Sequence, residues 1–223
     1  MRKFAVFDID GTLIRWQLYH AVVDRLAKNG TLGEGAHDTI REARMKWKRR
    51  EGNEGFAEYE SVMISLFDKA VSKLDPKDFD AMVESVIDEY KDQTYTYTRD
   101  LIQRLKEDSY VLLAISGSQK ELVARIAKHY GFDDFIATEY RREAGKFSGE
   151  VTVASHNKRA ALEQLVKKHN LTFEGSYAVG DSKSDAAMLE MVDHPIAFNP
   201  DQNLYKIAIR DNWKIVVERK NVI

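Results

Sequence analysis

Short apolar runs that end in polar residues recur along this chain. Phe4-Ala5-Val6-Phe7 is the first, and it is followed by Asp8 and a turn at Gly11. A run of this length, bounded by turn residues, is typical of a strand that is buried on both faces. Four further runs predict strands at residues 110–115, 177–179, 195–198 and 214–217.

Apolar residues at helical spacing lie between these predicted strands. Leu122, Ile126 and Tyr130 form one such set. The other sets are Ala161, Leu162, Leu165 and Val166, and then Ala187, Met188 and Met191. Strands that alternate with helices predict an α/β fold, with a Rossmann-like three-layer core around a mainly parallel sheet.

Residues 15–98 show helical periods but no strand pattern. Ile40, Ala43 and Trp47 fit one helix, and Asp75-Pro76 supplies an N-cap and a first helical position for another. A third helix is predicted by Phe56, Tyr59, Met63, Phe67 and Ala70. A block of about 80 residues is too long for an ordinary connection. We therefore expect an all-helical cap domain at 15–98, inserted into a core made of residues 1–14 and 99–223.

Composition excludes several classes of protein. The 43% hydrophobic and 31% charged residues are typical of a globular protein, and a net charge of −2 gives no reason to expect binding to nucleic acid or to an anionic membrane. No apolar run approaches the roughly 20 residues of a membrane span, and the first apolar stretch is too short for a signal peptide. A cytoplasmic location is expected. The absence of cysteine excludes disulfides and a cysteine nucleophile.

Three of the predicted strands end in polar clusters. Parallel strands place their carboxyl ends along one edge of the sheet, where ligands bind. An Asp-Gly turn or a Ser-Gly-Ser helix cap has an ordinary structural explanation when it stands alone. Three clusters at one edge instead indicate a site, because grouped carboxylates repel one another unless a cation lies among them. The clusters are Asp8 with Asp10, Ser116 with Ser118, and Asp181 with Asp185.

These residue types suit phosphoryl chemistry. Asp8 and Asp10 are two residues apart, so in an extended chain their side chains point the same way. One carboxylate can then attack phosphorus while the other protonates the leaving group. Ser116 and the amides of the following helix offer donors to phosphate oxygens, and Lys158 offers a balancing charge. A cluster of oxygen ligands without Cys or His favours Mg²⁺ over zinc.

With these residues the sequence resembles the haloacid dehalogenase-like superfamily, in particular the phosphoserine-phosphatase-like branch with a helical cap between the first and second motifs. The resemblance rests on four motifs in order. They are Asp8-Ile9-Asp10-Gly11-Thr12-Leu13, then Ser116-Gly117-Ser118, then Lys158 at 23 residues before Asp181, and finally Gly180-Asp181-Ser182-Lys183-Ser184-Asp185.

The resemblance implies a role for each matching residue. Asp8 would be the nucleophile that forms an aspartyl-phosphate, and Asp10 the general acid and then base. Lys158 would help to hold the phosphoryl group, with Lys146 as a competing lysine. Mg²⁺ would be bound by Asp8, the backbone carbonyl of Asp10, and Asp181, with support from Asp185. The candidates for substrate binding are Ser116, Gly117, Thr12 and Gln17.

The expected activity is Mg²⁺-dependent hydrolysis of a small phosphorylated metabolite. Phosphoserine itself is disfavoured, because Gln17 stands nine residues after Asp8, where phosphoserine phosphatases carry a glutamate. One alternative is a phosphotransferase or mutase with the same aspartyl-phosphate. The other is a non-catalytic binding protein, which would be expected to lose one of the main site residues. Those residues, Asp8, Asp10, Lys158 and Asp181, are all retained.

A run of cations between Arg41 and Arg50 has two interpretations. It could attract a polyanionic substrate, or it could be the solvated face of the helix whose apolar side contains Ile40 and Trp47. The second interpretation is favoured, because charge runs on amphipathic helices usually face solvent.

Overall fold

The computed structural model describes residues 1–51 and 55–219. The chain divides into two compact units. The first unit contains Met1–Gln17, Ile87–Glu139 and Val153–Ile223, and the second contains Leu18–Val86 and Tyr140–Thr152. Residues 220–223, which end the expected core range, lie outside the described part of the chain.

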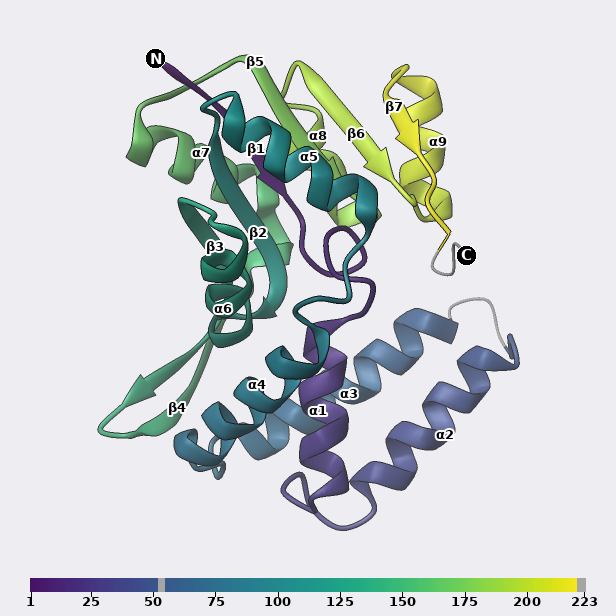
Figure 1. Ribbon diagram of the computed structural model, residues 1–223. Coiled ribbons are helices and arrows are strands. Elements are labelled where there is room, and N and C mark those ends of the chain that lie inside the picture. The colour runs from purple at the N-terminus through teal and green to yellow at the C-terminus, as the bar shows by residue number, and fades with distance from the viewer. Residues whose placement is uncertain (52–54, 220–223) are drawn as a thin grey trace. The chain divides into compact units, whose positions relative to one another are not determined.

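Seven strands form one sheet in the order β4-β3-β2-β1-β5-β6-β7 (Figure 1), and β1, β2, β5, β6 and β7 lie wholly in the first unit. The central strand β1 pairs in parallel with β2 and β5, so that Phe4 lies opposite Val111 and Ala5 opposite Tyr177. The outer pairs β2–β3, β5–β6 and β6–β7 are also parallel. The strands are β1 (Arg2–Phe7), β2 (Val111–Gln119), β3 (Asp134–Glu143), β4 (Lys146–Thr152), β5 (Leu171–Gly180), β6 (His194–Phe198) and β7 (Lys214–Val216).

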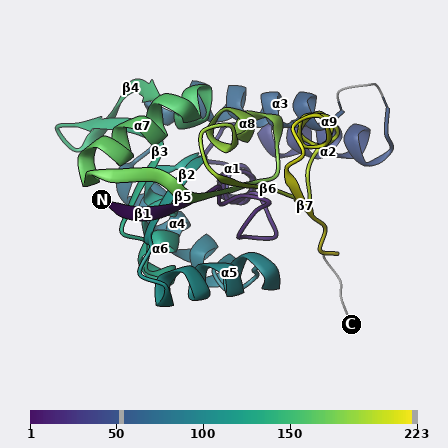
Figure 2. The same ribbon diagram turned by 90° about the horizontal axis from the view of Figure 1, so that it is seen from above.

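Helices form a layer on each side of this sheet. Figure 2 shows α5 and α6 on one side and α7, α8 and α9 on the other. Two short 3₁₀ turns, η1 and η2, precede α7 and α8. The expected α/β core with a mainly parallel sheet is thus confirmed. The helical elements are α5 (Thr96–Glu107), α6 (Lys120–Tyr130), η1 (Ala154–Asn157), α7 (Lys158–His169), η2 (Lys183–Asp185), α8 (Ala186–Leu189) and α9 (Gln202–Arg210).

Five of the seven strands coincide with the predicted apolar runs. The central strand β1 is buried from Phe4 to Phe7, as expected for a strand between two helical layers. The strands β3 and β4 were not predicted from apolar runs, because neither strand is buried along its whole length. Only two of the ten residues of β3 are buried, and only Phe147 is buried in β4.

The second unit is helical between residues 18 and 86. Asp75 caps α4 as predicted, since its Oδ1 accepts a hydrogen bond from the Lys77 amide at 2.8 Å. Trp47 of α2 stacks on Tyr59 of α3, with ring centroids 5.6 Å apart. The helices are α1 (Leu18–Lys28), α2 (Ala36–Lys48), α3 (Gly55–Val71) and α4 (Pro76–Tyr90). None of the described helices is long and apolar enough to cross a membrane.

The units differ from the expected division at 15–98 in three places. Residues 15–17 and 87–98 belong to the first unit, and residues 140–152 of the hairpin formed by β3 and β4 belong to the second. The hairpin joins the second unit through side chains: Phe147 packs edge-on against Phe79, and Arg142 donates two hydrogen bonds to the Asp80 carboxylate at 2.6 and 2.9 Å. These long-range contacts have no local sequence signal.

Candidate active site

The loop after β1 is a tight turn that carries Asp8. The Asp8 amide donates to the Val179 carbonyl at 2.9 Å, so the nucleophile candidate is fixed at the boundary of the sheet. Gly11 follows with φ +82°, a left-handed conformation that glycine adopts without steric cost. A Cβ atom at Gly11 would overlap the Oδ2 atom of Asp181. Glycine at this position therefore allows the loop to approach Asp181 closely.

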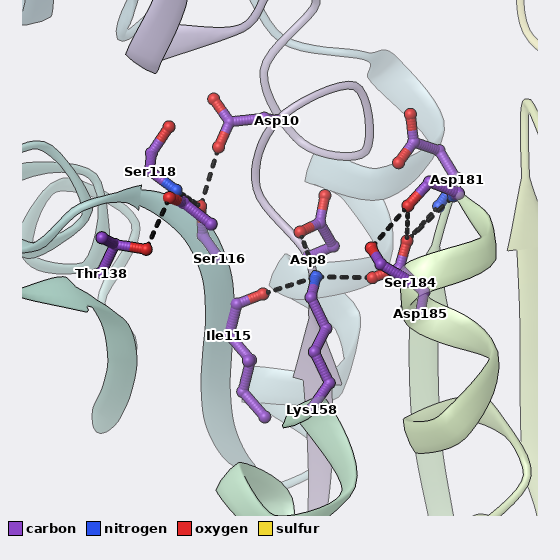
Figure 3. A network of polar contacts seen from close by, with 12 residues as sticks. Asp8, Asp10, Ile115, Ser116, Ser118, Thr138, Lys158, Asp181, Ser184 and Asp185 are labelled. Atoms are coloured by element: carbon purple, nitrogen blue, oxygen red, sulfur yellow. Dashed lines mark hydrogen bonds and ion pairs between the residues drawn. The ribbon is translucent and has the colours of Figure 1, made fainter. Parts of the chain in front are cut away.

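Lys158 lies between Asp8 and Asp185 at the centre of the candidate site (Figure 3). It begins α7, directly after Asn157, whose side chain caps this helix. Its Nζ atom donates to Asp8 Oδ1 at 2.7 Å, to Asp185 Oδ1 at 2.6 Å and to the Ile115 carbonyl at 3.2 Å. Burial alone would lower the pKa of this ammonium group, but the two carboxylates outweigh burial and raise the pKa. Lys158 is therefore a buried, permanently charged cation.

Asp185 uses both of its carboxylate oxygens on groups of this chain. Oδ1 accepts from Lys158, and Oδ2 accepts from the Asp181 amide at 3.1 Å and from the Ser182 amide at 2.9 Å. The Ser182 hydroxyl adds a third donor to Oδ2 at 3.0 Å. Gly180 permits this turn, because a Cβ atom there would collide with the Asp185 side chain. Asp185 thus fixes both the turn and the lysine.

Asp8, Asp181 and Asp185 each place one carboxylate oxygen within 4.8 Å of the others, a grouping that can hold a metal ion. Burial, with Asp185 and Asp10 adding to it, raises the pKa of Asp8 to about 7 against the opposing effect of Lys158. Burial and the Asp8 charge raise the pKa of Asp181 well above its usual range. Such crowded carboxylates favour a bound cation, and their oxygen-only donor set suits a hard divalent ion.

Asp10 points away from that grouping and toward β2. Its Oδ2 accepts a hydrogen bond from the Ser116 hydroxyl at 2.8 Å, and Ser116 Oγ in turn accepts from the Ser118 amide at 3.0 Å. Thr138 of β3 holds the same turn by donating to the Gly117 carbonyl at 2.7 Å. Asp10 and Ser116 therefore form a hydrogen-bonded pair at the edge of the sheet, separate from the three clustered carboxylates.

The remaining predicted residues take different positions. Gln17 lies beside the loop, with Nε2 3.5 Å from the place a Cβ would take on Gly11. Thr12 is fully buried, its hydroxyl has no hydrogen-bond partner among the described residues, and its carbonyl accepts from Thr98. Gly117 is close to Ser155, which a Cβ would meet at 3.3 Å. Lys146 is exposed at the start of β4, whereas Lys158 contacts Asp8.

Two of the contacts within the site were not identified from the sequence. The Ile115 carbonyl, an acceptor for Lys158, is a backbone atom and leaves no residue-type signal. The capping box of Ser182 and Asp185 does have a signal, a serine followed three residues later by an acid. That pattern would have identified Asp185 as a cap as well as a candidate metal ligand.

Comparison with known proteins agrees with this arrangement. The model of the haloacid dehalogenase-like hydrolase family matches residues 5–190. The chain belongs to this family. A probable phosphatase of Mycobacterium tuberculosis (strain ATCC 25618 / H37Rv) is 34% identical over 119 residues, which are 52% of this chain and 42% of that protein. The chain thus spans less than half of that relative's length.

Two other proteins match over nearly the whole chain. The phosphoserine phosphatase of Methanocaldococcus jannaschii is 26% identical over 225 residues, which cover 99% of this chain and 94% of that protein. A crystal structure of a protein of unknown function from Bordetella pertussis Tohama I superimposes with a TM-score of 0.77 at 23% identity, covering 97% of this chain and 98% of that one. This structural likeness shows a shared fold.

Proposed function

We propose that this member of the family is a Mg²⁺-dependent phosphatase that hydrolyses small phosphomonoesters through an aspartyl-phosphate on Asp8. The observation that carries the proposal is the arrangement of two carboxylates with different partners. Asp8 contacts a buried cation, Lys158, at 2.7 Å, while Asp10 accepts a hydrogen bond from Ser116. These different partners support Asp8 as the carboxylate that attacks and Asp10 as the group that transfers the proton.

The oxygen donors at this site fit Mg²⁺. Asp8 and Asp181 would each contribute a carboxylate oxygen, and Asp10 its backbone carbonyl. Asp185 would support these ligands without binding the ion itself, since its two oxygens already accept hydrogen bonds from Lys158, Asp181 and Ser182. When bound, Mg²⁺ would offset the negative charge of the phosphoryl group and of the attacking carboxylate.

The chain's own residues account for both chemical steps. In the first, an Asp8 oxygen forms a bond to phosphorus as the ester P–O bond breaks, and Asp10 gives its proton to the departing alkoxide. In the second, Asp10 takes a proton from water as that water attacks phosphorus, so that inorganic phosphate leaves and Asp8 is regenerated. Lys158 faces Asp8 throughout and holds this carboxylate in one orientation.

The substrate class follows from the groups near the nucleophile. Gln17 supplies a neutral amide next to Gly11, and an amide pairs less strongly than a carboxylate with an ammonium group. We therefore propose a small phosphorylated metabolite other than phosphoserine. A panel of phosphorylated amino acids, sugars, nucleotides and lipid head groups would identify it.

Hydrolysis of p-nitrophenyl phosphate by the purified protein tests the proposal. Activity is expected with Mg²⁺, none with excess EDTA, and a loss of at least 1,000-fold in Asp8→Asn, by the scale of a lost nucleophile. Asp78→Asn, an exposed residue of α4, is the matched control and should keep full activity. Activity that survives in Asp8→Asn would overturn the assignment. Transfer to added alcohols in preference to water would instead indicate a phosphotransferase.

A further inference from the structure

A pocket lies in the first unit, away from the clustered carboxylates. Its volume is about 340 Å³. It includes His194 and Lys214, the first residues of β6 and β7, whereas the carboxylates follow the opposite, carboxyl ends of β1 and β5. None of the site residues above lines it. The lining residues are Tyr97, Arg104, Tyr177, Asp193, His194, Pro195, Ile196, Asn212, Trp213 and Lys214.

The strand register explains which side of the sheet the pocket occupies. Tyr177 lies opposite His194, and Ile196 lies opposite Lys214. Because side chains alternate along a strand, these four side chains share one face. Tyr97 of α5 lines the same pocket, so this is the face on which α5 lies (Figure 2).

Aromatic rings line the pocket. The Tyr177 and His194 rings lie 4.5 Å apart with an interplanar angle of 30°. Tyr97 stacks on Phe198 at 5.9 Å and 10°, and its hydroxyl is buried with no hydrogen-bond partner among the described residues. Flat rings with such fixed orientations favour a planar ligand, since aromatic faces stack on any π-system.

Two cations stand beside the rings. Lys214 Nζ lies 5.4 Å from the centroid of the Tyr97 ring, and Arg104 lies two turns further along α5. Neither forms an ion pair with any residue that the structure describes. An ammonium and a guanidinium that lack carboxylate partners attract an anion, and phosphate is the anion that both groups bind well.

Hydrogen-bonding groups complete the pocket. One oxygen of Asp193 accepts from the Gly175 amide at 2.6 Å, and its other oxygen has no partner among the described residues. Such an oxygen can accept from a hydroxyl group, and the Asn212 amide can both donate and accept. A volume of about 340 Å³ lies at the lower end of the range for small-molecule sites. This size suits one nucleotide rather than two.

We propose that this pocket binds a nucleoside monophosphate. The base packs against the rings of Tyr177 and His194, and the phosphate is held by Arg104 and Lys214. The ribose hydroxyls face Asp193. The site is separate from the proposed catalytic centre, and binding requires no chemistry there.

Calorimetric titration of AMP into the Asp8→Asn variant with EDTA present tests this site without hydrolysis. Saturable binding is expected. The double variant Arg104→Gln, Lys214→Gln in the same background should bind AMP at least tenfold more weakly, and Tyr177→Leu should also weaken it. Lys206→Gln, an exposed cation on α9 outside the pocket, should leave the affinity unchanged.

Two further ligands separate the contributions of ring and phosphate. Adenosine and ribose 5-phosphate should each bind at least tenfold more weakly than AMP. The absence of saturable AMP binding, or AMP binding that persists in the double variant, would overturn the proposal, as would equal affinity for AMP and ribose 5-phosphate. Since p-nitrophenyl phosphatase activity is measured separately in the native protein, failure of this proposal leaves the proposed function untouched.

Discussion

The ammonium nitrogen of Lys158 lies 2.7 Å from an oxygen of Asp8, and both side chains are almost fully buried. The same nitrogen lies 2.6 Å from Asp185, so one positive charge faces two buried carboxylates. Removing one partner from such a buried arrangement leaves charge without compensation, and this costs far more than the loss of a surface ion pair.

Lys158→Met is therefore expected to lower the free energy of unfolding by about 3–5 kcal/mol at pH 8. The loss should shrink toward pH 5. In the native protein Lys158 opposes the rise in the pKa of Asp8, which is about 7. Without Lys158 this pKa rises further above its unfolded value, so the variant gains more stability than the native protein as pH falls. Urea unfolding at both pH values measures this, with exposed Lys167→Met as control. An equal loss at both pH values would contradict the argument.

Mg²⁺ and protons should compete for the clustered carboxylates. With the pKa of Asp8 raised to about 7, only about a tenth of this carboxylate is ionised at pH 6 and about nine tenths at pH 8. Mg²⁺ is thus expected to bind roughly tenfold more weakly at pH 6 than at pH 8 and to release protons on binding. Calorimetry in buffers of different ionisation enthalpy counts these protons. Affinity that does not change with pH would show that Asp8 is already ionised.

Asp10→Asn should affect substrates according to their leaving groups. An alkyl alkoxide needs a proton as it departs, so hydrolysis of an alkyl phosphate is expected to fall by roughly 100- to 10,000-fold. Nitrophenolate departs readily without one, so p-nitrophenyl phosphate should be affected much less in the first step. Pre-steady-state kinetics with both substrates measure this difference. Equal losses in the first step would argue against Asp10 as the proton donor.

Gly11→Ala separates backbone strain from crowding at the site. Gly11 and Gly30 both have positive φ, but a Cβ at Gly30 meets nothing within 4 Å, whereas one at Gly11 overlaps Asp181. Both variants should lose about 1–2 kcal/mol of stability from the left-handed conformation. Only Gly11→Ala should lose more than this and also bind Mg²⁺ more weakly. Thermal unfolding with and without Mg²⁺ compares them, and equal behaviour would show that Asp181 moves aside freely.

The central part of the fold follows from local patterns. The run from Phe4 to Phe7 is apolar at every position because both faces of β1 are covered, and such a run is visible in the sequence. The three polar strand ends are also readable, since parallel strands must bring them to one edge. The strands β3 and β4 lack this signal because they are partly exposed. The attachment of the hairpin to the second unit depends on the pairing of Arg142 with Asp80, 62 residues apart.

Within the site, residue type was more predictable than residue partner. Asp8, Lys158, Asp181 and Asp185 were expected near one another, and the structure places them together. The hydrogen bond from Ser116 to Asp10 spans 106 positions in sequence and depends on how two neighbouring strands align. Spacing along the chain carries no information about such a contact.

Both oxygens of the Asp185 carboxylate accept hydrogen bonds, and this has a consequence for how the protein folds. Its oxygens are held by Lys158, Asp181 and Ser182, so the turn at residues 180–185 is shaped by the chain itself. Lys158 acts as a resident counter-ion among the acids. We therefore expect the chain to fold without a metal ion, in contrast to domains whose folding energy comes from the ion. Folding and the proposed binding of Mg²⁺ would then be separate events.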